Sequence, residues 1–147
     1  MSKILILNGP NLNLLHLRDK TQYGFSSLAN IEKDCLDLAQ QIGVDLQLRQ
    51  TNSEGGMVEE IQEAIESFDA IIINAAGYTH TSVAIRDALE IFKGVKIELH
   101  ISNIHKREDF RHNSLISAVV DGIICGIGAQ GYPIALLAAD KMLKNRA

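Results

Sequence analysis

Apolar residues fall into short runs bounded by turn residues, and these runs predict five β-strands. The runs are Ile4–Leu7, Val44–Gln50, Ala70–Ile73, Val95–Ile101 and Gly122–Cys125. The first run is unbroken and stops at Gly9-Pro10, as a strand buried on both faces of a parallel sheet does. The second run alternates apolar with polar residues, which predicts a half-exposed strand near a sheet edge.

Between the strands, apolar residues recur at helical spacing. The predicted helices are Phe25–Ile42, Met57–Phe68, Thr79–Phe92 and Tyr132–Leu143. The stretch His105–Val120 reads as a short polar connection followed by an apolar, helix-like segment. The last helix is apolar over most of its circumference, so we expect the sheet or another subunit to cover it.

Strand and helix alternate five times without a long linker, an internal repeat or a low-complexity tract. This alternation predicts an α/β fold, a flavodoxin-like, doubly wound five-stranded parallel sheet with helices on both faces. A length of 147 residues predicts one domain, residues 1–147. In this layout strands one, three and four end close together, at the sheet edge where α/β proteins bind ligands.

Composition narrows the classes of function. A net charge of −4 argues against a nucleic-acid binder, and no apolar stretch reaches the ~20 residues that a membrane span needs. Cys35 and Cys125 are isolated thiols, and no signal-peptide region follows Met1, so we expect a cytoplasmic protein. The basic group Lys106, Arg107 and Arg111 fits a small anion or a solvated face.

The polar segment after the first strand carries Asn11, Arg18 and Tyr23. A free tyrosine is a poor base at neutral pH, because its phenol is almost wholly protonated. A nearby guanidinium favours the phenolate and cannot give up its own proton, so Arg18 could make Tyr23 a usable base. Alternatively, Arg18 is solvated and Tyr23 only anchors the loop.

The fourth predicted strand places Glu98, His100 and Ser102 on one side. In a sheet covered on both faces, a carboxylate and a histidine on that side must satisfy one another, which would make His100 an acid oriented by Glu98. The alternative is an edge strand with one solvent-exposed face, and Lys96 on the same side favours this alternative.

The loop from Asn74 to Ser82 follows an apolar strand and opens a helix. Helix N-termini attract anions, and Asn74 and His80 add side-chain donors, so a carboxylate would fit there. A well-capped helix start explains the same residues without any ligand.

Two further motifs do not support a cofactor. Gly126 to Gly131 matches GxGxxG, but the chain ends before the acidic residue that a dinucleotide site needs ~20 positions later. We therefore interpret these glycines as allowing tight turns and close packing. The histidines and cysteines show no metal-ligand spacing, so we expect neither a metal nor a cofactor.

Taken together, these motifs resemble the type II 3-dehydroquinate dehydratases, the metal-free enzymes of the shikimate pathway of aromatic amino acid biosynthesis. The resemblance runs almost end to end, through Asn8 to Leu15, Tyr23-Gly24, Thr79 to Ser82, Glu98 to Asn103, Phe110-Arg111 and Gly126 to Tyr132. It implies a lyase that eliminates water from 3-dehydroquinate in the anti sense, through an enolate, to give 3-dehydroshikimate.

The resemblance also implies a role for each site residue. Tyr23, assisted by Arg18, would take the proton alpha to the ketone, and Asn11 would hold a water on the enolate oxygen. His100, oriented by Glu98, would protonate the departing hydroxyl. The remaining contacts to substrate would come from Asn74 and the amides of Ile101 and Ser102 at the carboxylate, from His80 and Arg111 at the ring hydroxyls, and from Asp87 in a neighbouring subunit of a trimer-based homododecamer.

The chain departs from the family pattern in the first loop, where His16 replaces a usual glycine and Asp19-Lys20 a common acidic-proline pair. Without that proline we expect a more mobile lid over Tyr23. Ala75-Ala76-Gly77 stands where Pro-Gly-Ala is common, which leaves open which amide faces the substrate.

Two alternatives remain at this point. One is a flavodoxin-like module that binds a flavin or a small acid without catalysis, although the first loop offers asparagines rather than the hydroxyl-rich loop that a flavin phosphate needs. The other is the same chemistry serving quinate breakdown, which residues alone do not separate from biosynthesis.

Overall fold

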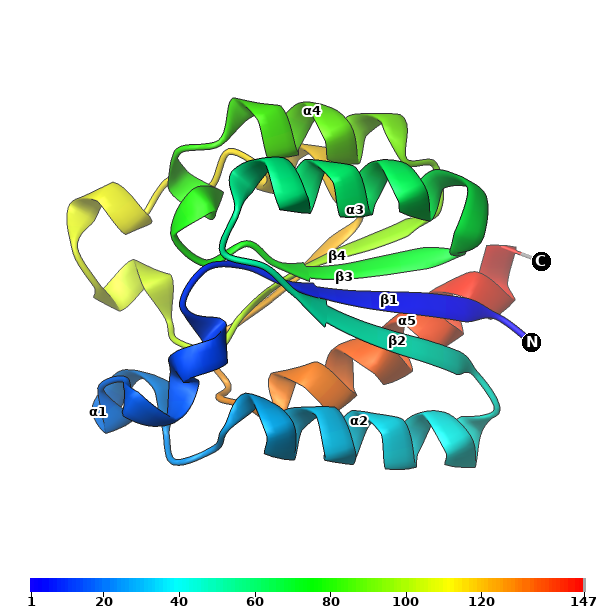
Figure 1. Cartoon of the computed structure of the whole chain (residues 1–147), viewed down its shortest axis with the longest axis horizontal. Helices are drawn as coiled ribbons and strands as arrows, with labels where there is room; N and C mark the ends of the chain where they lie inside the picture. The colour runs from blue at the N-terminus through cyan, green and yellow to red at the C-terminus, as the bar shows by residue number, and fades with distance from the viewer. Residues whose placement is uncertain (147) are drawn as a thin grey trace.

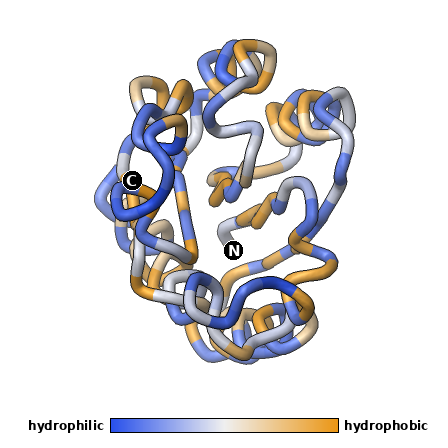
Figure 2. The backbone as a smooth tube through the Cα atoms, turned by 90° about the vertical axis from the view of Figure 1, so that its left-hand side faces the viewer, coloured by the Kyte–Doolittle hydropathy of each residue, from blue (hydrophilic) through white to orange (hydrophobic). Residues whose placement is uncertain are grey.

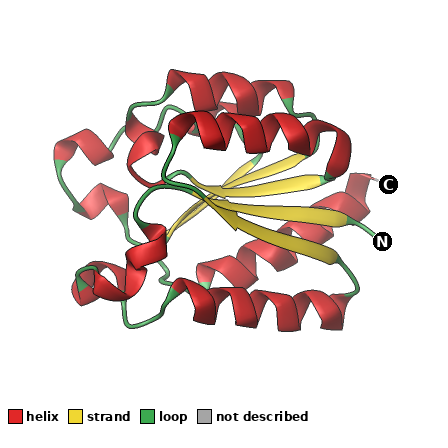
Figure 3. Ribbon diagram, viewed as in Figure 1, coloured by secondary structure: helices red, strands yellow, loops and turns green. Residues whose placement is uncertain are grey.

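The computed structural model describes residues 1–146, and its centre is a five-stranded parallel sheet (Figures 1 and 3). The strand order is β2-β1-β3-β4-β5. The strands are β1 (Lys3–Asn8), β2 (Asp45–Gln50), β3 (Ala70–Asn74), β4 (Val95–His100) and β5 (Gly122–Cys125). The α-helices are α1 (Lys20–Tyr23), α2 (Leu28–Ile42), α3 (Glu54–Ser67), α4 (Val83–Ile91) and α5 (Gly131–Arg146). The 3-10 turns are η1 (Leu12–Leu17), η2 (Ala76–His80), η3 (Ile104–Lys106), η4 (Asp109–Arg111) and η5 (Ser117–Val119).

Helices cover both faces of the sheet, as Figure 2 shows in a view along the strands. Helices α2 and α5 pack on one face around Ile4, Ile72 and Leu99, while α3 and α4 pack on the other around Leu5 and Ile71. Alternate residues of each central strand thus enter opposite cores, which explains the unbroken apolar run of β1. The predicted α/β, doubly wound fold is confirmed, whereas the prediction of one domain over 1–147 stays a prediction.

The strand order confirms two further expectations. Strand β2 lies at an edge, as its alternating pattern predicts, and β1, β3 and β4 are adjacent. Strand β4 lies inside the sheet, so the edge-strand alternative for Glu98 and His100 is wrong, and both side chains are buried. Among the helices of residues 1–146, none is long and apolar enough to cross a membrane.

The prediction of an apolar, helix-like segment before β5 is wrong. Between β4 and β5 the chain forms only the three short turns η3, η4 and η5. Ser114 Oγ accepts hydrogen bonds from the backbone amides of Ile116 and Ser117, at 3.3 and 3.2 Å, in place of helical carbonyls. Serine side chains that bond nearby backbone in this way compete with helix formation.

The helix predicted from Thr79 also starts later than expected. The serine cap at Ser82 accepts from the amide of Ile85 at 2.9 Å, so α4 begins at Val83, and the residues before it form η2. Ser27 likewise caps α2. Polar side chains therefore fix where the helices on both faces begin.

The glycines of the GxGxxG stretch have the structural role that their sequence context predicts. Gly126 has a φ of 87°, and a Cβ there would lie 2.9 Å from the Asn103 side chain. A Cβ on Gly131 would lie 2.9 Å from Leu99 Cδ1. These glycines let the last loop turn tightly and let α5 approach the sheet.

The loops that follow β1 and β3 touch directly. Gly9 donates its amide to the carbonyl of Asn74 at 2.8 Å, and a Cβ on Gly9 would lie 2.7 Å from the carbonyl oxygen of Ala75. Because the obstacle is the backbone of Ala75, a larger residue cannot enter without moving one of the two loops.

The Gly9→Ala substitution should therefore lower the free energy of unfolding by about 1–3 kcal/mol. Urea denaturation followed by circular dichroism measures this change. Gly77→Ala is the matched control, because a Cβ at Gly77 meets nothing within 4 Å. Equal stability of the two variants would contradict the proposed close approach.

Candidate active site

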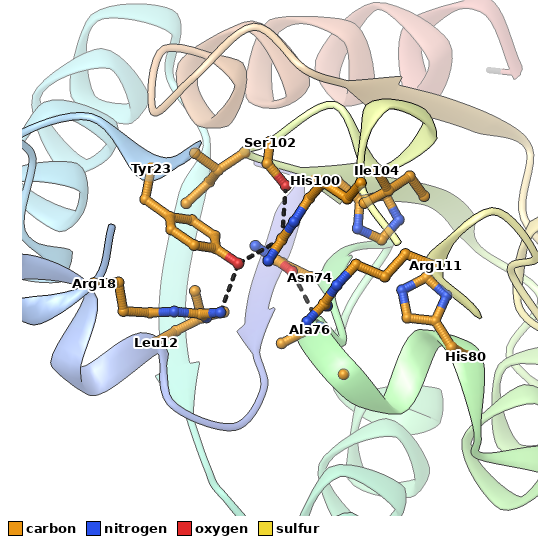
Figure 4. A pocket seen from close by; sticks show the side chains of 13 residues that line it. Leu12, Arg18, Tyr23, Asn74, Ala76, His80, His100, Ser102, Ile104 and Arg111 are labelled. Carbon is orange, nitrogen blue, oxygen red and sulfur yellow. Dashed lines mark hydrogen bonds between the residues drawn. The ribbon is translucent and has the colours of Figure 1, made fainter. Parts of the chain in front are cut away.

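A cleft of about 350 Å³, counting its open mouth, lies at the carboxyl ends of β1, β3 and β4 (Figure 4). The lining residues come from the last positions of these strands and from the loops after them. They are Leu12, Arg18, Tyr23, Asn74, Ala76, Gly77, His80, His100, Ile101, Ser102, Ile104, Arg107 and Arg111. The site thus forms where the ends of neighbouring parallel strands meet.

The phenol oxygen of Tyr23 lies between two guanidinium groups. Arg18 Nη2 donates to it at 2.5 Å and Arg107 Nη1 at 2.6 Å. Both guanidinium carbons also lie near the ring of Tyr23, 4.0 and 5.2 Å from its centroid. Two cationic donors at one oxygen can stabilise negative charge that develops there during a reaction. The alternative in which Arg18 is merely solvated does not fit this geometry, which Figure 4 shows for Arg18 and Tyr23.

Arg107 is the residue that sequence reasoning missed as a partner of Tyr23. It also donates to Ser102 Oγ at 3.1 Å, and its own loop lies beyond β4, 84 residues from Tyr23. The signal was the basic group Lys106, Arg107 and Arg111, of which the two arginines line the cleft and Lys106 is exposed. The resemblance singled out Arg111, but no pattern in the sequence distinguishes Arg107 from Lys106, because the turn η3 decides which of them faces inward.

His100 and Glu98 form a buried pair behind the cleft. His100 Nε2 lies 2.5 Å from Glu98 Oε2, and Glu98 accepts further hydrogen bonds from Ser117 at 2.5 Å and Ser114 at 2.9 Å. Burial by itself would raise the pKa of Glu98, but the bonds from His100 and the two serines outweigh it and lower that pKa. The ionised Glu98 binds Nε2 of His100, which leaves Nδ1 as the ring nitrogen that can form a hydrogen bond with a ligand.

The loop after β3 supplies polar groups on the opposite wall. Asn74 Oδ1 accepts from the amide of Ala76 at 3.1 Å, so that amide is already engaged and is not the one that faces a ligand. His80 Nδ1 lies 2.9 Å from the carbonyl of Asn113, which only accepts, so Nδ1 carries the proton. Burial lowers the pKa of His80, with smaller contributions from nearby positive groups, and the neutral ring offers Nε2 as an acceptor.

The structure brings most of the predicted site residues together. Tyr23, Arg18, His100, Asn74, His80, Ile101, Ser102 and Arg111 all line the cleft, and Glu98 lies behind His100.

Besides Glu98, two predicted residues lie outside the cleft lining. Asn11 is exposed, with a φ of 70°, and its amide donates to Asn52 Oδ1 at 3.0 Å. Asp87 is exposed on α4 and pairs with Arg86 at 3.2 Å. The functional roles of all these residues stay predictions. Among residues 1–146, no three His, Cys, Asp or Glu side chains form a group that could hold a metal ion.

The segment that carries Arg18 and Tyr23 has its own local contacts. Asp19 Oδ1 accepts from the amide and the hydroxyl of Thr21, at 2.9 and 2.8 Å, and thereby caps α1. Lys20 Nζ donates to the carbonyl of His16. The residues that replace the family's proline thus cap a single helical turn, and the greater mobility of this lid stays a prediction.

Ser117 donates a hydrogen bond to the buried Glu98 carboxylate, so its contribution to the free energy of unfolding should depend on pH. Ser117→Ala removes a hydrogen bond to a charged group and should cost about 1.5–3 kcal/mol of unfolding free energy at neutral pH. The folded-state pKa of Glu98 lies below its ordinary value of 4.5, so ionised Glu98 adds stability above that value and loses it as the pH falls through the lowered pKa.

The difference between parent and variant should therefore narrow below pH 4.5. Urea denaturation at a series of pH values measures it. A difference that stayed constant from neutral to acidic pH would show that Ser117 does not act through the Glu98 carboxylate.

Comparison with known proteins places the chain among enzymes. The family model described as dehydroquinase class II matches residues 2–140. A protein named 3-dehydroquinate dehydratase from Pasteurella multocida is 51% identical over 145 residues, which cover 99% of this chain and 98% of that protein. One from Pseudomonas putida, named 3-dehydroquinate dehydratase 2, is 47% identical over 98% of this chain and 97% of its own length.

Solved structures of type II dehydroquinases have the same fold as this chain. The type II dehydroquinase of Butyrivibrio crossotus superposes with a TM-score of 0.92 at 40% identity, covering 95% of this chain and 97% of that one. The type II dehydroquinase of Propionibacterium acnes superposes with a TM-score of 0.90 at 38% identity, covering 98% and 97%. Sequence, family model and three-dimensional structure agree, and the chain belongs to the type II dehydroquinase family.

Proposed function

We propose that this protein is a 3-dehydroquinate dehydratase of the shikimate pathway, which removes water from 3-dehydroquinate in the anti sense to give 3-dehydroshikimate. The observation that carries the proposal is the phenol oxygen of Tyr23, held by Arg18 and Arg107 in the same cleft as His100. A base and an acid on one small cleft are what an elimination next to a ketone requires.

The first step breaks the carbon–hydrogen bond alpha to the ketone. The Tyr23 phenolate takes that proton, and the electron pair moves onto the ketone oxygen to give an enolate. A water held by Asn11 stabilises the enolate in this proposal. Asn11 is exposed and precedes Leu12 of the cleft lining, which suits contact through a water better than direct contact.

The second step breaks the carbon–oxygen bond beta to the ketone. Nδ1 of His100 gives its proton to the departing hydroxyl, which leaves as water, and the enolate collapses to the conjugated enone. Glu98 stabilises the positive ring before this transfer and keeps Nε2 protonated afterwards. A proton then returns through solvent from Tyr23 to His100, which resets both groups.

The polar walls of the cleft hold the substrate while these steps occur. Asn74 and the amides of Ile101 and Ser102 bind its carboxylate in this proposal, and Arg111 and neutral His80 bind ring hydroxyls. His80 accepts through Nε2, because Nδ1 is committed to Asn113. Holding the ring at several points fixes the reacting bonds relative to Tyr23 and His100.

We also propose that the protein assembles as a homododecamer built from trimers, in which Asp87 contacts the active site of a neighbouring subunit. Val83, Asp87 and Ile91 lie four residues apart on one face of α4, and all three are exposed. An apolar stripe with one carboxylate in it suits a subunit contact.

A cytoplasmic location completes the proposal. Cys35 is buried, and burial raises its pKa to about 12, so its thiol is unreactive. Cys125 is likewise a free thiol. Two unpaired cysteines fit a reducing compartment.

The base is tested by Tyr23→Phe, which should lower kcat by about 10²- to 10⁴-fold, while substrate still binds. Turnover of 3-dehydroquinate is followed as enone absorbance in the presence of a chelator. None of the cleft-lining residues in the described chain is a lysine, so borohydride should trap no Schiff base. Tyr78→Phe is the matched control, because the Tyr78 hydroxyl donates to the carbonyl of Asn52 outside the cleft. No turnover by the unmutated protein would end the proposal.

The second guanidinium is tested by Arg107→Gln, which removes the charge but keeps a polar side chain. Losing one of the two charged hydrogen bonds to the Tyr23 oxygen should lower kcat at neutral pH by about 10- to 100-fold. Lys106→Gln removes the neighbouring, exposed charge as a control and should leave kcat unchanged. An unchanged kcat for Arg107→Gln would leave Arg18 as the group that activates Tyr23.

The assembly is tested by sedimentation or light scattering of the purified protein, which should report twelve times the chain mass of 16.1 kDa. The Asp87→Asn variant should keep that mass but bind substrate more weakly. A fully active monomer would contradict both the assembly and the proposed role of Asp87.

A further inference from the structure

A buried chain of hydrogen bonds connects the cleft to the interior of the protein. The hydroxyl of Tyr132, in the first turn of α5, lies between Asn8 at the end of β1 and Asn74 at the end of β3. It lies 2.6 Å from Asn8 Oδ1 and 3.0 Å from Asn74 Nδ2. Tyr132 is fully buried, and both asparagines are at most 4% exposed.

The directions of these hydrogen bonds follow from one backbone group. The amide of Ala76 can only donate, so the atom of Asn74 that faces it must be Oδ1. Nδ2 then faces Tyr132, and the Tyr132 oxygen must accept from it. The single hydroxyl hydrogen of Tyr132 is left for Asn8, whose facing atom is an oxygen.

The same reasoning fixes what Asn74 presents to the cleft. An amide nitrogen carries two hydrogens, and Tyr132 takes one of them. The second remains for a ligand, because Asn74 lines the cleft. A reversed amide would place two donors against one another at Ala76 and leave a buried oxygen against the Tyr132 oxygen.

We propose that Tyr132 is a positioning residue, which locks the Asn74 amide so that it acts as a hydrogen-bond donor to the substrate carboxylate. The inference rests on the proposed function for the identity of that carboxylate. Tyr132 does not itself take part in proton transfer, because burial raises its pKa and keeps the hydroxyl neutral.

The first test is Tyr132→Phe, which removes only the hydroxyl. The KM for 3-dehydroquinate should rise about tenfold, as expected when a hydrogen bond to a charged group is weakened. The value of kcat should change by less than about threefold, and its pH profile should not move, because Tyr23 and His100 keep their partners. A fall in kcat with unchanged KM would overturn the proposal.

Two further variants separate positioning from a general loss of packing. Leu136→Val removes a methylene from the buried face of the same helix, outside the hydrogen-bond chain, and should leave KM unchanged. In an Asn74→Ala background, Tyr132→Phe should change KM by less than about twofold, because the side chain that it positions is gone. Additive effects of the two substitutions would show that Tyr132 acts by another route.

Neutron diffraction of the unmutated, deuterated protein tests the geometry without any variant or activity. It should show a deuterium of Asn74 Nδ2 directed at Tyr132 and the hydroxyl deuterium of Tyr132 directed at Asn8. A hydroxyl deuterium that pointed at Asn74 would overturn the inference. This readout stands even if the protein does not turn over 3-dehydroquinate, in which case the proposed function fails but the locked amide does not.

Discussion

Two positive charges that share one phenol oxygen repel each other, so the scaffold has to hold them in place. Arg18 and Tyr23 belong to the segment after β1, whereas Arg107 belongs to the segment after β4. Parallel strands end at one edge of the sheet, and this places both segments at the same cleft. The proposed base is therefore a product of sheet topology as much as of local sequence.

The same edge carries two groups of buried polar side chains whose members satisfy one another. The Glu98 carboxylate has three side-chain donors, from His100, Ser114 and Ser117. Asn8, Asn74 and Tyr132 satisfy one another below the cleft. Matched groups cost little to bury and have few alternative arrangements, so the cleft is held in shape before a substrate arrives.

Much of this arrangement could be predicted from the sequence. The two periodicities, of about 3.6 residues in helices and two in strands, were enough for the strands, for the long helices and for the adjacency of β1, β3 and β4. They also placed Glu98 and His100 on one side of a strand. Periodicity failed between β4 and β5, because apolar residues such as Ile116 are buried there by turns that serine side chains stabilise.

That failure explains why Arg107 was missed. A position in a turn has no periodic rule to say which way its side chain faces, whereas a position in a strand does. The resemblance to a family supplied roles for residues in strands, loops and turns, including Arg111 in η4, but none for Arg107. The tertiary structure was needed to find this second guanidinium.

The 84 residues that separate Tyr23 from Arg107 have a consequence for folding. Contacts between distant parts of a chain form late, since closing a long loop costs entropy before any contact repays it. Helical signal can therefore return early during refolding, whereas the phenol acquires both of its cations only once the sheet is assembled through β4. Recovery of the proposed catalysis would then mark a late stage of folding. A partly folded chain would carry Tyr23 without the Arg107 guanidinium at its phenol oxygen.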